Sequence, residues 1–393
     1  MAISLLGDGI FLVAIAWQAY IISDRPSALA YVGVATAAPQ VALLLVGGAV
    51  SDRFPRRALL FWADVARGVA VAIVAFVLAR GEARLYELCL VGAVIGTATA
   101  FASPALDALV PQLVPEEELT QANAIDQFVR PTAIQLAGPA LGGLAVAVLH
   151  PWGAFALDSA TFAASALCVA RLAPLPAPGV SSSLRREMTE GLRYVRDRVW
   201  LWATFVCATF TYLLFIGPTQ VLLPYVVRNT LHHGASTYGA VLAAGGLGAL
   251  MGAVLAGRRR YPRRPMLWIY GWWALATLAV AGYGWATSSW GLAAAALVVN
   301  GAEAVGAVVW ATLKQRRVPN EMLGRVSSID WCISTALLPL SYALTAPVAS
   351  VLGPRDTLIL AGTLGALVTI GFLFVPGMRE GEQSRPALIG ETA

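Results

Sequence analysis

Stretches of apolar residues recur from one end of this chain to the other. An α-helix needs about 20 apolar residues to cross a hydrocarbon layer roughly 30 Å thick, and most of these stretches reach that length. Of the 393 residues, 58% are hydrophobic and only 12% are charged, whereas roughly a quarter of a soluble domain is charged. Because backbone groups in hydrocarbon must pair within their own segment, these stretches are expected to be helices. The sequence therefore predicts an all-α membrane protein.

The apolar stretches predict twelve transmembrane helices in two six-helix bundles. The first six helices are expected at residues 1–22, 28–50, 58–79, 85–106, 131–149 and 151–170. The other six are expected at 200–227, 236–256, 266–287, 290–312, 330–352 and 356–375. Residues 1–170 and 200–375 would then form two bundles, with a linker at 171–199 and a tail at 376–393.

The linker changes in character along its length. It begins with prolines and serines and continues as LRREMTEGLRYVRDR, which ends at Arg198. Leu184, Met188, Leu192 and Val195 recur at helical spacing, with arginines between them. This pattern predicts an amphipathic helix that lies on the cytoplasmic surface of the membrane.

The distribution of basic residues predicts the orientation, because Lys and Arg accumulate in cytoplasmic connections. With both termini inside, 21 of the 27 Lys and Arg residues fall in cytoplasmic connections, helix ends and the tail. The other six are Arg25, Arg80, Arg84, Arg228 and Arg355 on the opposite face and Arg67 within a span. We therefore expect a multi-pass protein of the inner (plasma) membrane, with both termini cytoplasmic. The net charge of +5 fits anionic lipid, and no nucleic-acid partner is inferred.

Two loops repeat between the halves of the chain. The segment FPRRALL at 54–60 resembles YPRRPML at 261–267, an offset of 207 residues. The segment VPEEELTQANAID at 114–126 parallels VPNEMLGRVSSID at 318–330, an offset of 204 residues. Six predicted spans separate the equivalent loops, so both halves keep one orientation about an axis along the membrane normal.

The first of these loops carries a resemblance to a known family. The sequence GAVSDRFPRR at 48–57 resembles the signature between helices two and three of major facilitator transporters, although Pro55 stands where the family usually has a second glycine. The resemblance implies the major facilitator fold and a cytoplasmic gating role, in which the aspartate engages the positive end of a helix in the other half. The matching residues are Gly48, Asp52, Arg53, Arg56 and Arg57.

A second motif in the fifth span points to the direction of transport. Gly138, Pro139, Gly142 and Gly143 resemble an element of exporters, especially proton antiporters, in the same family. The alternative is that these small residues only permit close helix packing. The LGDG, PEEELTQANA and EGLRYVR segments together resemble the branch of macrolide-efflux and enterobactin-exporter-like proteins. This resemblance covers nearly the whole chain. The chain departs from drug:proton antiporters at the fourth span, which lacks the arginine of their proton-relay signature.

Three carboxylates inside predicted spans are candidates for coupling transport to protons: Glu303, Asp158 and Asp8. A charge near the bilayer centre costs about 2.5 to 3.5 kcal/mol, so such residues are functional candidates. A glutamate that only holds helices together is an equally good interpretation of Glu303. Asp64 and Arg67 lie three residues apart on one helical face, and we expect them to neutralise each other.

Aromatic and amide side chains predict a substrate cavity between spans one and seven, the two helices that line it in this family. The candidates are Trp17, Gln18, Tyr212, Phe215 and Gln220. Pro218 and Pro224 are expected to break span seven and to free backbone carbonyls. The alternative is packing against lipid, since Trp and Tyr are common at membrane interfaces. We interpret four other tryptophans as such an interfacial belt: Trp272, Trp273, Trp285 and Trp290.

The sequence contains no phosphate-binding loop and no histidine pair with metal spacing, so we predict neither an enzyme nor a metal or cofactor site. We expect a secondary transporter that exports an amphipathic small molecule, such as a drug, natural product or siderophore. Proton antiport is the expected drive, and we infer no obligate protein partner. Two alternatives stay open: an importer or facilitator of a small metabolite, and a non-pumping sensor or lipid-handling protein of the same fold.

Overall fold

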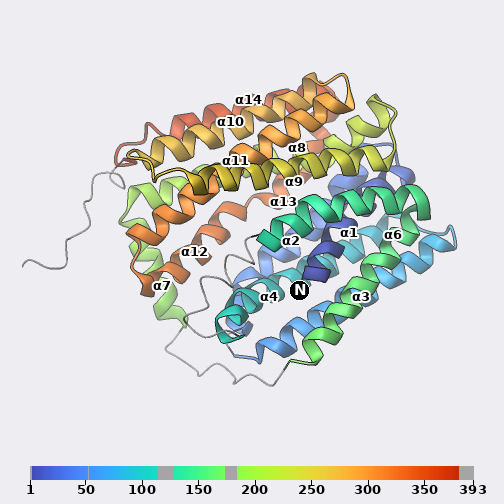
Figure 1. Ribbon diagram of the computed structural model, residues 1–393, viewed down its shortest axis with the longest axis horizontal. Helices are drawn as coiled ribbons and strands as arrows, with labels where there is room; N and C mark the ends of the chain where they lie inside the picture. The colour runs from blue at the N-terminus through green and yellow to red at the C-terminus, as the bar shows by residue number, and fades with distance from the viewer. Residues whose placement is uncertain (1, 52, 114–127, 173–183, 380–393) are drawn as a thin grey trace, which may run out of the picture.

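The computed structural model describes the chain except residues 1, 52, 114–127, 173–183 and 380–393 (Figure 1). The described residues form helices, and no strand occurs among them. The helices before residue 180 are α1 (Ala2–Ile22), α2 (Pro26–Ser51), α3 (Arg56–Ala79), α4 (Leu85–Leu113), η2 (Thr132–Ala137) and α6 (Gly138–Ala170). The later helices are α7 (Leu184–Arg196), α8 (Val199–Tyr225), η3 (Val226–Thr230), α9 (Ala235–Arg258), α10 (Pro265–Trp285), α11 (Ser289–Arg317), α12 (Asn320–Thr335), α13 (Leu338–Leu352) and α14 (Pro354–Phe372).

The helices gather into two groups that lie side by side (Figure 1). In the first group, α1 and α3 pack against α6, and α4 packs against α2 and α3. In the second group, α11 packs against α9 and α10, and α14 packs against α10 and α8. The two groups meet mainly where α13 contacts α2 and where α9 contacts α6.

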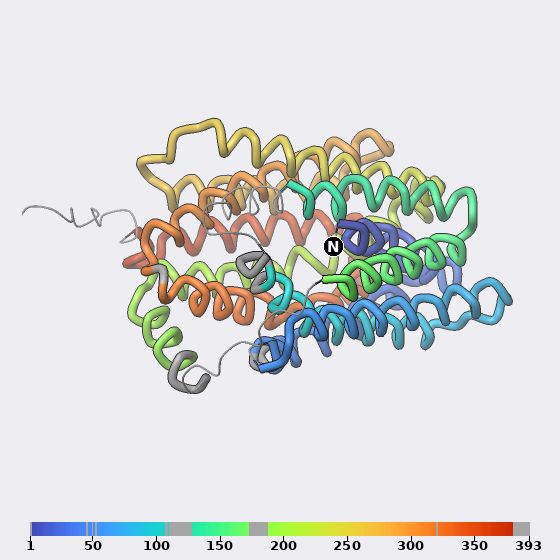
Figure 2. Tube along the Cα trace, turned by 60° about the horizontal axis from the view of Figure 1, so that its bottom comes forward, coloured from blue at the N-terminus to red at the C-terminus, as the bar shows by residue number. Residues whose placement is uncertain are grey.

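Eleven stretches of the described residues are long and apolar enough to cross a membrane. One of them, Phe128–Ala170, has 43 residues, which as a straight helix would be about 65 Å long and far thicker than a bilayer core. The chain reverses direction within it (Figures 1 and 2) at His150, where φ is 60° and ψ is 170°. Pro151 follows, and the residue before a proline is disfavoured in the helical region. The two spans expected at 131–149 and 151–170 therefore lie in one element, α6 with η2 before it.

The predicted span at 330–352 lies within one apolar stretch, Glu321–Leu352, that is long enough to cross a membrane. This stretch contains two helices, α12 and α13, which are separated at residues 336–337. Pro339 lies in the first turn of α13 and lacks a backbone N–H, so it cannot continue the hydrogen-bonded ladder of the preceding helix. The predicted span is therefore interrupted locally.

The expected breaks in span seven did not form: α8 stays helical through Pro218 and Pro224. Near Pro218, a side chain of α13 takes the place of one backbone hydrogen bond of α8. Ser341 of α13 donates its hydroxyl to the Leu213 carbonyl at 2.7 Å and accepts from the Gly217 N–H at 2.8 Å. The hydroxyl thus stands between two backbone groups that would pair with each other in a regular helix.

The predicted amphipathic helix in the linker is present as α7, which packs against α12 and α8. Arg325 of α12 donates to Glu190 at 2.9 Å, and the Tyr194 hydroxyl donates to the Arg317 carbonyl at 3.3 Å. Val195 is buried, whereas Met188 and Leu192 keep exposed apolar side chains. An apolar strip therefore stays uncovered on α7.

Buried apolar side chains form three separate clusters. The largest joins both helix groups at one end of the molecule and includes Tyr20, Phe155 and Leu222. The other two each belong to one group: one contains Trp200 and Leu313 in α8 and α11, and another joins α3, α4 and α6. The two groups therefore share a core at one end and have separate cores at the other.

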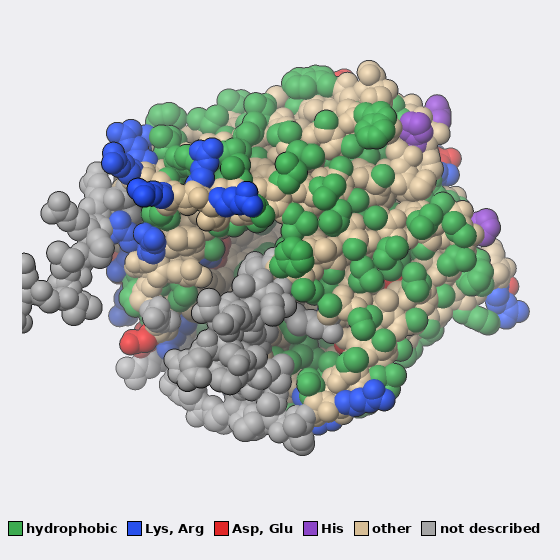
Figure 3. Space-filling model, in the orientation of Figure 1, with side chains coloured by type: hydrophobic (Ala, Val, Ile, Leu, Met, Phe, Trp, Pro, Cys, Tyr) green, Lys and Arg blue, Asp and Glu red, His purple; other side chains and the backbone are tan. Residues whose placement is uncertain are grey.

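Polar contacts reinforce the end at which the groups are joined. The Tyr20 hydroxyl of α1 donates to the Val221 carbonyl of α8 at 2.5 Å. Arg228 forms an ion pair with Asp24 at 2.8 Å and also donates to the Tyr20 carbonyl. In Figure 3 the histidines lie at this end, and most Lys and Arg side chains gather at the opposite end, beside a hollow in the surface.

Candidate functional site

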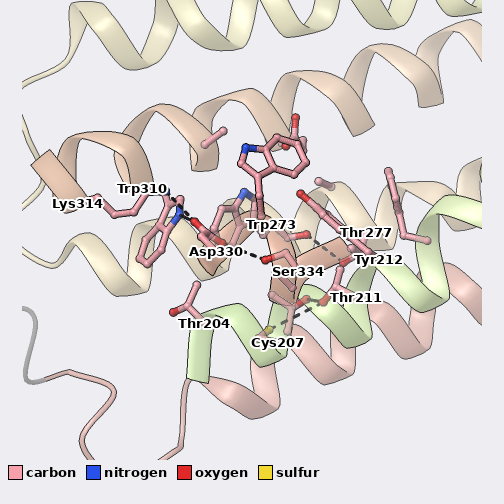
Figure 4. Close-up of a pocket in the computed structure, with 17 residues that line it drawn as sticks. Thr204, Cys207, Thr211, Tyr212, Trp273, Thr277, Trp310, Lys314, Asp330 and Ser334 are labelled. Carbon is pink, nitrogen blue, oxygen red and sulfur yellow. Dashed lines mark hydrogen bonds and ion pairs between the residues drawn. The ribbon is translucent and has the colours of Figure 1, made fainter. Parts of the chain in front are cut away.

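A cavity of about 290 Å³ lies inside the second helix group (Figure 4). It is enclosed by α8, α10, α11, α12 and α14. Of the 17 residues that line it, nine are aromatic or small and apolar, and eight are polar or charged. The residues used below are Tyr212, Phe215, Trp273, Glu303, Trp310, Lys314, Asp330 and Ser334.

Glu303 stands at the midpoint of α11 and lines this cavity. Its side chain is exposed and lies at this cavity. Within the described part of the chain, its carboxylate has neither a hydrogen-bond partner nor an ion-pair partner, and it interacts electrostatically with Tyr212. The cavity therefore presents one uncompensated carboxylate.

A second carboxylate at the cavity, Asp330 of α12, is fully compensated. It accepts from Lys314 at 2.7 Å and from the Trp310 indole N–H at 3.1 Å. Ser334 donates to its other oxygen at 3.0 Å. Lys314 lies 11 residues after Glu303 on the same helix, about 16 Å along the axis. The lysine therefore neutralises Asp330 and leaves Glu303 without a cation.

The aromatic wall is held by edge-to-face contacts around Trp310. Its ring centroid lies 5.8 Å from that of Trp200, 6.2 Å from that of Phe205 and 6.2 Å from that of Trp273. Aromatic pairs prefer this arrangement over face-to-face stacking. Trp273 therefore belongs to the cavity, and its assignment to an interfacial belt was wrong.

The predicted cavity residues divide into two sets. Tyr212 and Phe215 line the cavity, together with the coupling candidate Glu303. Trp17, Gln18 and Gln220 do not line it. Gln18 is buried in α1, and Trp17 lies at the joined end, where the Arg228 guanidinium is 6.0 Å from its ring. Of the residues predicted for a cavity between spans one and seven, only Tyr212 and Phe215 of span seven line this cavity.

Asp330 and Lys314 were not among the predicted site residues. Asp330 ends the segment 318–330 that repeats 114–126 of the first half, and this was the only signal for it in the sequence. Asp126, its counterpart, lies outside the described residues. The repeat singled out Asp330 in the sequence, and the structure shows that this residue binds Lys314 in the cavity wall.

The other two coupling candidates, Asp8 and Asp158, lie in the first helix group, away from the cavity. They interact electrostatically with each other and with Arg67. Asp64 and Arg67, which were expected to neutralise each other, interact electrostatically but form no ion pair within 4.0 Å. Asp64 accepts from Ser165 at 2.6 Å, and Arg67 donates to Thr99 at 3.1 Å.

The glycine motif at the start of α6 lies between α1 and α9. Gly138 is packed against Gly9 of α1, and Gly142 against Ile10 of the same helix. Gly143 faces Gly239 of α9, so this motif joins the two helix groups. Pro139 has no N–H for the Gln135 carbonyl, and this carbonyl lies against Gly246 of α9. The small residues therefore allow the backbone of α6 to contact the backbones of α1 and α9 directly.

A bulky side chain at this contact is expected to weaken the joined end. A Cβ atom on Gly143 would lie 2.8 Å from the Ala235 carbonyl oxygen and 3.0 Å from the Gly239 Cα, so the α9 backbone must move. We expect Gly143→Leu to lower the free energy of unfolding in detergent by roughly 1 to 3 kcal/mol. Gly271→Leu is the matched control, since nothing lies within 4 Å of its Cβ position. Equal melting temperatures for the two variants would contradict this account.

The loop motif at 48–57 is described except for Asp52, which lies outside the described residues. Arg57 donates to the Val169 carbonyl at 3.2 Å and to the Ala170 carbonyl, which are the last residues of α6. A cation at a helix C-terminus satisfies free carbonyls and the negative end of the dipole. Arg53 is exposed, Arg56 begins α3, and nothing lies within 4 Å of a Cβ placed on Gly48.

Comparison with known proteins decides the family. A family model described as transmembrane secretion effector matches residues 1–386. This chain belongs to the major facilitator superfamily. A macrolide efflux protein A of Streptococcus pyogenes is 25% identical over 332 residues, which cover 82% of this chain and 81% of that protein. An enterobactin exporter of Escherichia coli is 27% identical over 340 residues, which cover 83% and 80%.

Solved structures of other transporters share the fold. The transporter resembles a bacterial homologue of the iron transporter ferroportin in an inward-facing state, with a TM-score of 0.71 and 16% identity over 94% of this chain and 96% of the other. It also resembles a D-xylose-proton symporter, with a TM-score of 0.67 and 17% identity over 96% and 97%. The sequence-based resemblance to major facilitator transporters, including the efflux-named branch, is thereby confirmed.

Proposed function

We propose that this major facilitator protein is a secondary active transporter that exports amphipathic small molecules carrying a positive charge, in exchange for protons. The site is the cavity among α8, α10, α11, α12 and α14. Drugs, natural products and siderophores are candidate substrate types. The efflux names of two relatives support the direction of transport.

The observation that carries this proposal is the unpaired Glu303 carboxylate in an aromatic cavity. A carboxylate in such a site is best compensated by a cation, because an unpaired charge away from water is unfavourable. Trp273 and Tyr212 place aromatic rings in the cavity wall, and such rings attract organic cations, whereas the Trp310 ring already has the Lys314 Nζ atom 5.3 Å from its centroid. The apolar remainder of the wall suits the hydrophobic part of an amphiphile. A proton and a cationic substrate would compete for Glu303, and this competition would couple their movements.

We propose twelve membrane crossings, by counting each arm of the reversed α6 as one. The arginine-rich end would face the cytoplasm, with both termini inside, as positive residues favour. The bundles 1–170 and 200–375, the linker 171–199 and the tail 376–393 remain our division of the chain. With separate cores at the arginine-rich end, the molecule would be open to the cytoplasm, and rocking of the bundles would expose the site alternately.

Two motifs are proposed to act in that rocking. Asp52, in the 48–57 loop, is our candidate for the latch at the cytoplasmic end, and Arg57 would hold this loop to the end of α6. The glycine contact between α6 and α9 would be the surface on which the bundles pivot. Close backbone packing permits two discrete arrangements with few side-chain obstacles.

The test is accumulation of fluorescent cationic amphiphiles in cells that express the transporter, with and without an uncoupler. We expect lower accumulation than in empty cells, lost on uncoupling and lost in Asp52→Asn. A substrate-dependent rise in accumulation favours an importer or facilitator of a small metabolite. If no probe moves in either direction, a sensor or lipid-handling protein of the same fold is favoured, and the export proposal is abandoned.

A further inference from the structure

A groove of about 620 Å³ lies on the outer surface of the second helix group. Residues of α9, α10 and α11 line it, and both α9 and α10 pack against α11. Among the described residues that line it, Arg258 alone carries a charge, and it is the last residue of α9. Met251 and Val254 in its wall are 60% and 52% exposed, so the groove opens away from the helix group.

Glycines give the groove its shape. A Cβ on Gly248 of α9 would collide with the Leu297 carbonyl of α11, and a Cβ on Gly252 would collide with the Gly301 carbonyl. The backbones of the two helices therefore meet directly, as small residues in membrane helices allow. Because both glycines lack a side chain, the surface along this contact stays hollow, and larger apolar side chains stand beside it.

The groove and the substrate cavity lie on different sides of α10 and α11. Trp272 lines the groove, and the next residue, Trp273, lines the cavity. On α11, Gly301 and Val305 line the groove, whereas Glu303 lines the cavity. Residues two apart on a helix point about 200° apart, so these side chains face opposite ways. The groove is therefore a separate site that faces the membrane.

The length of the groove matches one leaflet of a bilayer. Gly248 lies near the middle of α9, and Arg258 ends this helix. The rise of an α-helix over that interval is about 15 Å. Half of a hydrocarbon core of roughly 30 Å is also about 15 Å. An acyl chain in the groove would therefore place a lipid phosphate beside Arg258.

The end of the groove at Arg258 is strongly positive. Arg259, Arg260, Arg263 and Arg264 follow in the connection to α10, and the last turn of α11 is also basic. No Asp or Glu occurs in the sequence from residue 198 to residue 302. Within the described part of the chain, the Arg258 guanidinium has neither a hydrogen-bond partner nor an ion-pair partner. Figure 3 shows Lys and Arg side chains beside hydrophobic ones at this end of the helix group. An apolar groove that ends in unpaired positive charge complements an anionic amphiphile.

We propose that this groove binds an anionic phospholipid from the leaflet at the arginine-rich end. One acyl chain lies along α9 and α11, and the phosphate pairs with Arg258. The basic connection between α9 and α10 favours a head group without a cation, such as glycerol, over choline. The site requires both the groove and the charge, so it differs from a general attraction of arginines to the membrane surface. It does not depend on the proposed function, because lipid binding is measured without a transported substrate.

The experiment is native mass spectrometry of the purified full-length protein in detergent, titrated with dioleoyl phosphatidylglycerol or dioleoyl phosphatidylcholine. We expect the first phosphatidylglycerol to bind more tightly than phosphatidylcholine. Arg258→Gln should weaken phosphatidylglycerol binding about fivefold, the contribution of one basic residue at an anionic lipid surface, and should leave phosphatidylcholine binding unchanged. Arg171→Gln is the matched control, since Arg171 is an exposed arginine at the end of α6, outside the groove.

A second pair of variants tests the acyl chain. Val298→Trp fills the groove from α11 and should abolish the tight binding of phosphatidylglycerol. Leu275→Trp fills it from α10 and replaces Val298→Trp if that variant does not fold. Leu367→Trp is the control, because Leu367 is 65% exposed on α14 and does not line the groove.

Four results would overturn the inference. Equal affinity of the wild type for the two lipids would show that the groove does not select an anion. Equal losses in Arg258→Gln and Arg171→Gln would show diffuse attraction without a site. Unchanged phosphatidylglycerol binding in the groove-filling variants would place the lipid elsewhere. Displacement of the lipid by inorganic phosphate would show an anion site that does not hold an acyl chain.

Discussion

Glu303→Gln is expected to abolish the export of cationic amphiphiles while leaving the transporter folded. Glutamine keeps the size of the side chain and removes its charge, so the cavity loses the group that compensates a cation. Removing one partner of a desolvated charge pair costs about 2 kcal/mol or more, which corresponds to roughly 30-fold weaker binding. Binding of a fluorescent cation to the purified protein and its accumulation in cells both measure this loss.

Two comparisons make this result specific. A neutral amphiphile of similar size should bind the wild type and Glu303→Gln with similar affinity, since its contacts are with the aromatic wall. Glu82→Gln removes an exposed carboxylate between α3 and α4 and should leave the affinity for the cation unchanged. If Glu303→Gln binds the cation as tightly as the wild type, the proposed role of Glu303 is wrong.

Lys314→Met is expected to destabilise the second helix group strongly. The side chains of Lys314 and Asp330 are only 14% and 16% exposed, and their charged atoms lie 2.7 Å apart. Removal of the lysine leaves Asp330 with two neutral donors, Trp310 and Ser334, and no cation. Breaking a buried pair in this way costs about 3 to 5 kcal/mol. Unfolding of the purified protein in mixed micelles measures the change.

The double variant Lys314→Met with Asp330→Asn should recover most of that loss, because it removes both charges of the pair and leaves neither partner unpaired. Arg196→Met provides a control at an exposed pair with Asp197, whose side chains are 79% and 54% exposed. Such a surface pair contributes at most about 1 kcal/mol. Single and double variants that unfold alike would show that the attraction between Lys314 and Asp330 does not stabilise the protein.

Helical structure was predictable because hydrocarbon leaves the backbone no other partner than itself. The first apolar stretch was expected at 1–22, and α1 occupies Ala2–Ile22. The same reasoning missed the interruption between α12 and α13 and the continuity of α8. The backbone pairing of α8 around Gly217 involves Ser341, whose hydroxyl bonds this helix from more than 120 residues later in the chain. The pattern of residues near Ser341 in the sequence does not indicate this contact.

Only part of the candidate site could be predicted, because only some of its residues stand out in the sequence. Glu303 was found because a carboxylate within an apolar stretch is conspicuous in the sequence itself. Tyr212 and Phe215 were found because they are aromatic residues of a span that lines the cavity in the family that the chain resembles. Lys314 and Asp330 were missed, because a lysine near a helix end is also expected from the positive-inside rule. Trp273 was assigned to the membrane interface, since composition does not distinguish a tryptophan that faces lipid from one that faces a cavity.

The sequence by itself determined that this chain is a helical membrane protein of the major facilitator type and which carboxylates lie inside its spans. These properties follow from single residues and short motifs, because the transfer of each helix into hydrocarbon depends on its own composition. The tertiary structure alone decided which carboxylates are compensated: Lys314 pairs with Asp330, whereas Glu303 and Asp158 have no cation in contact. Pairing depends on distances of a few ångströms between side chains on different helices, and only the packing of those helices sets these distances.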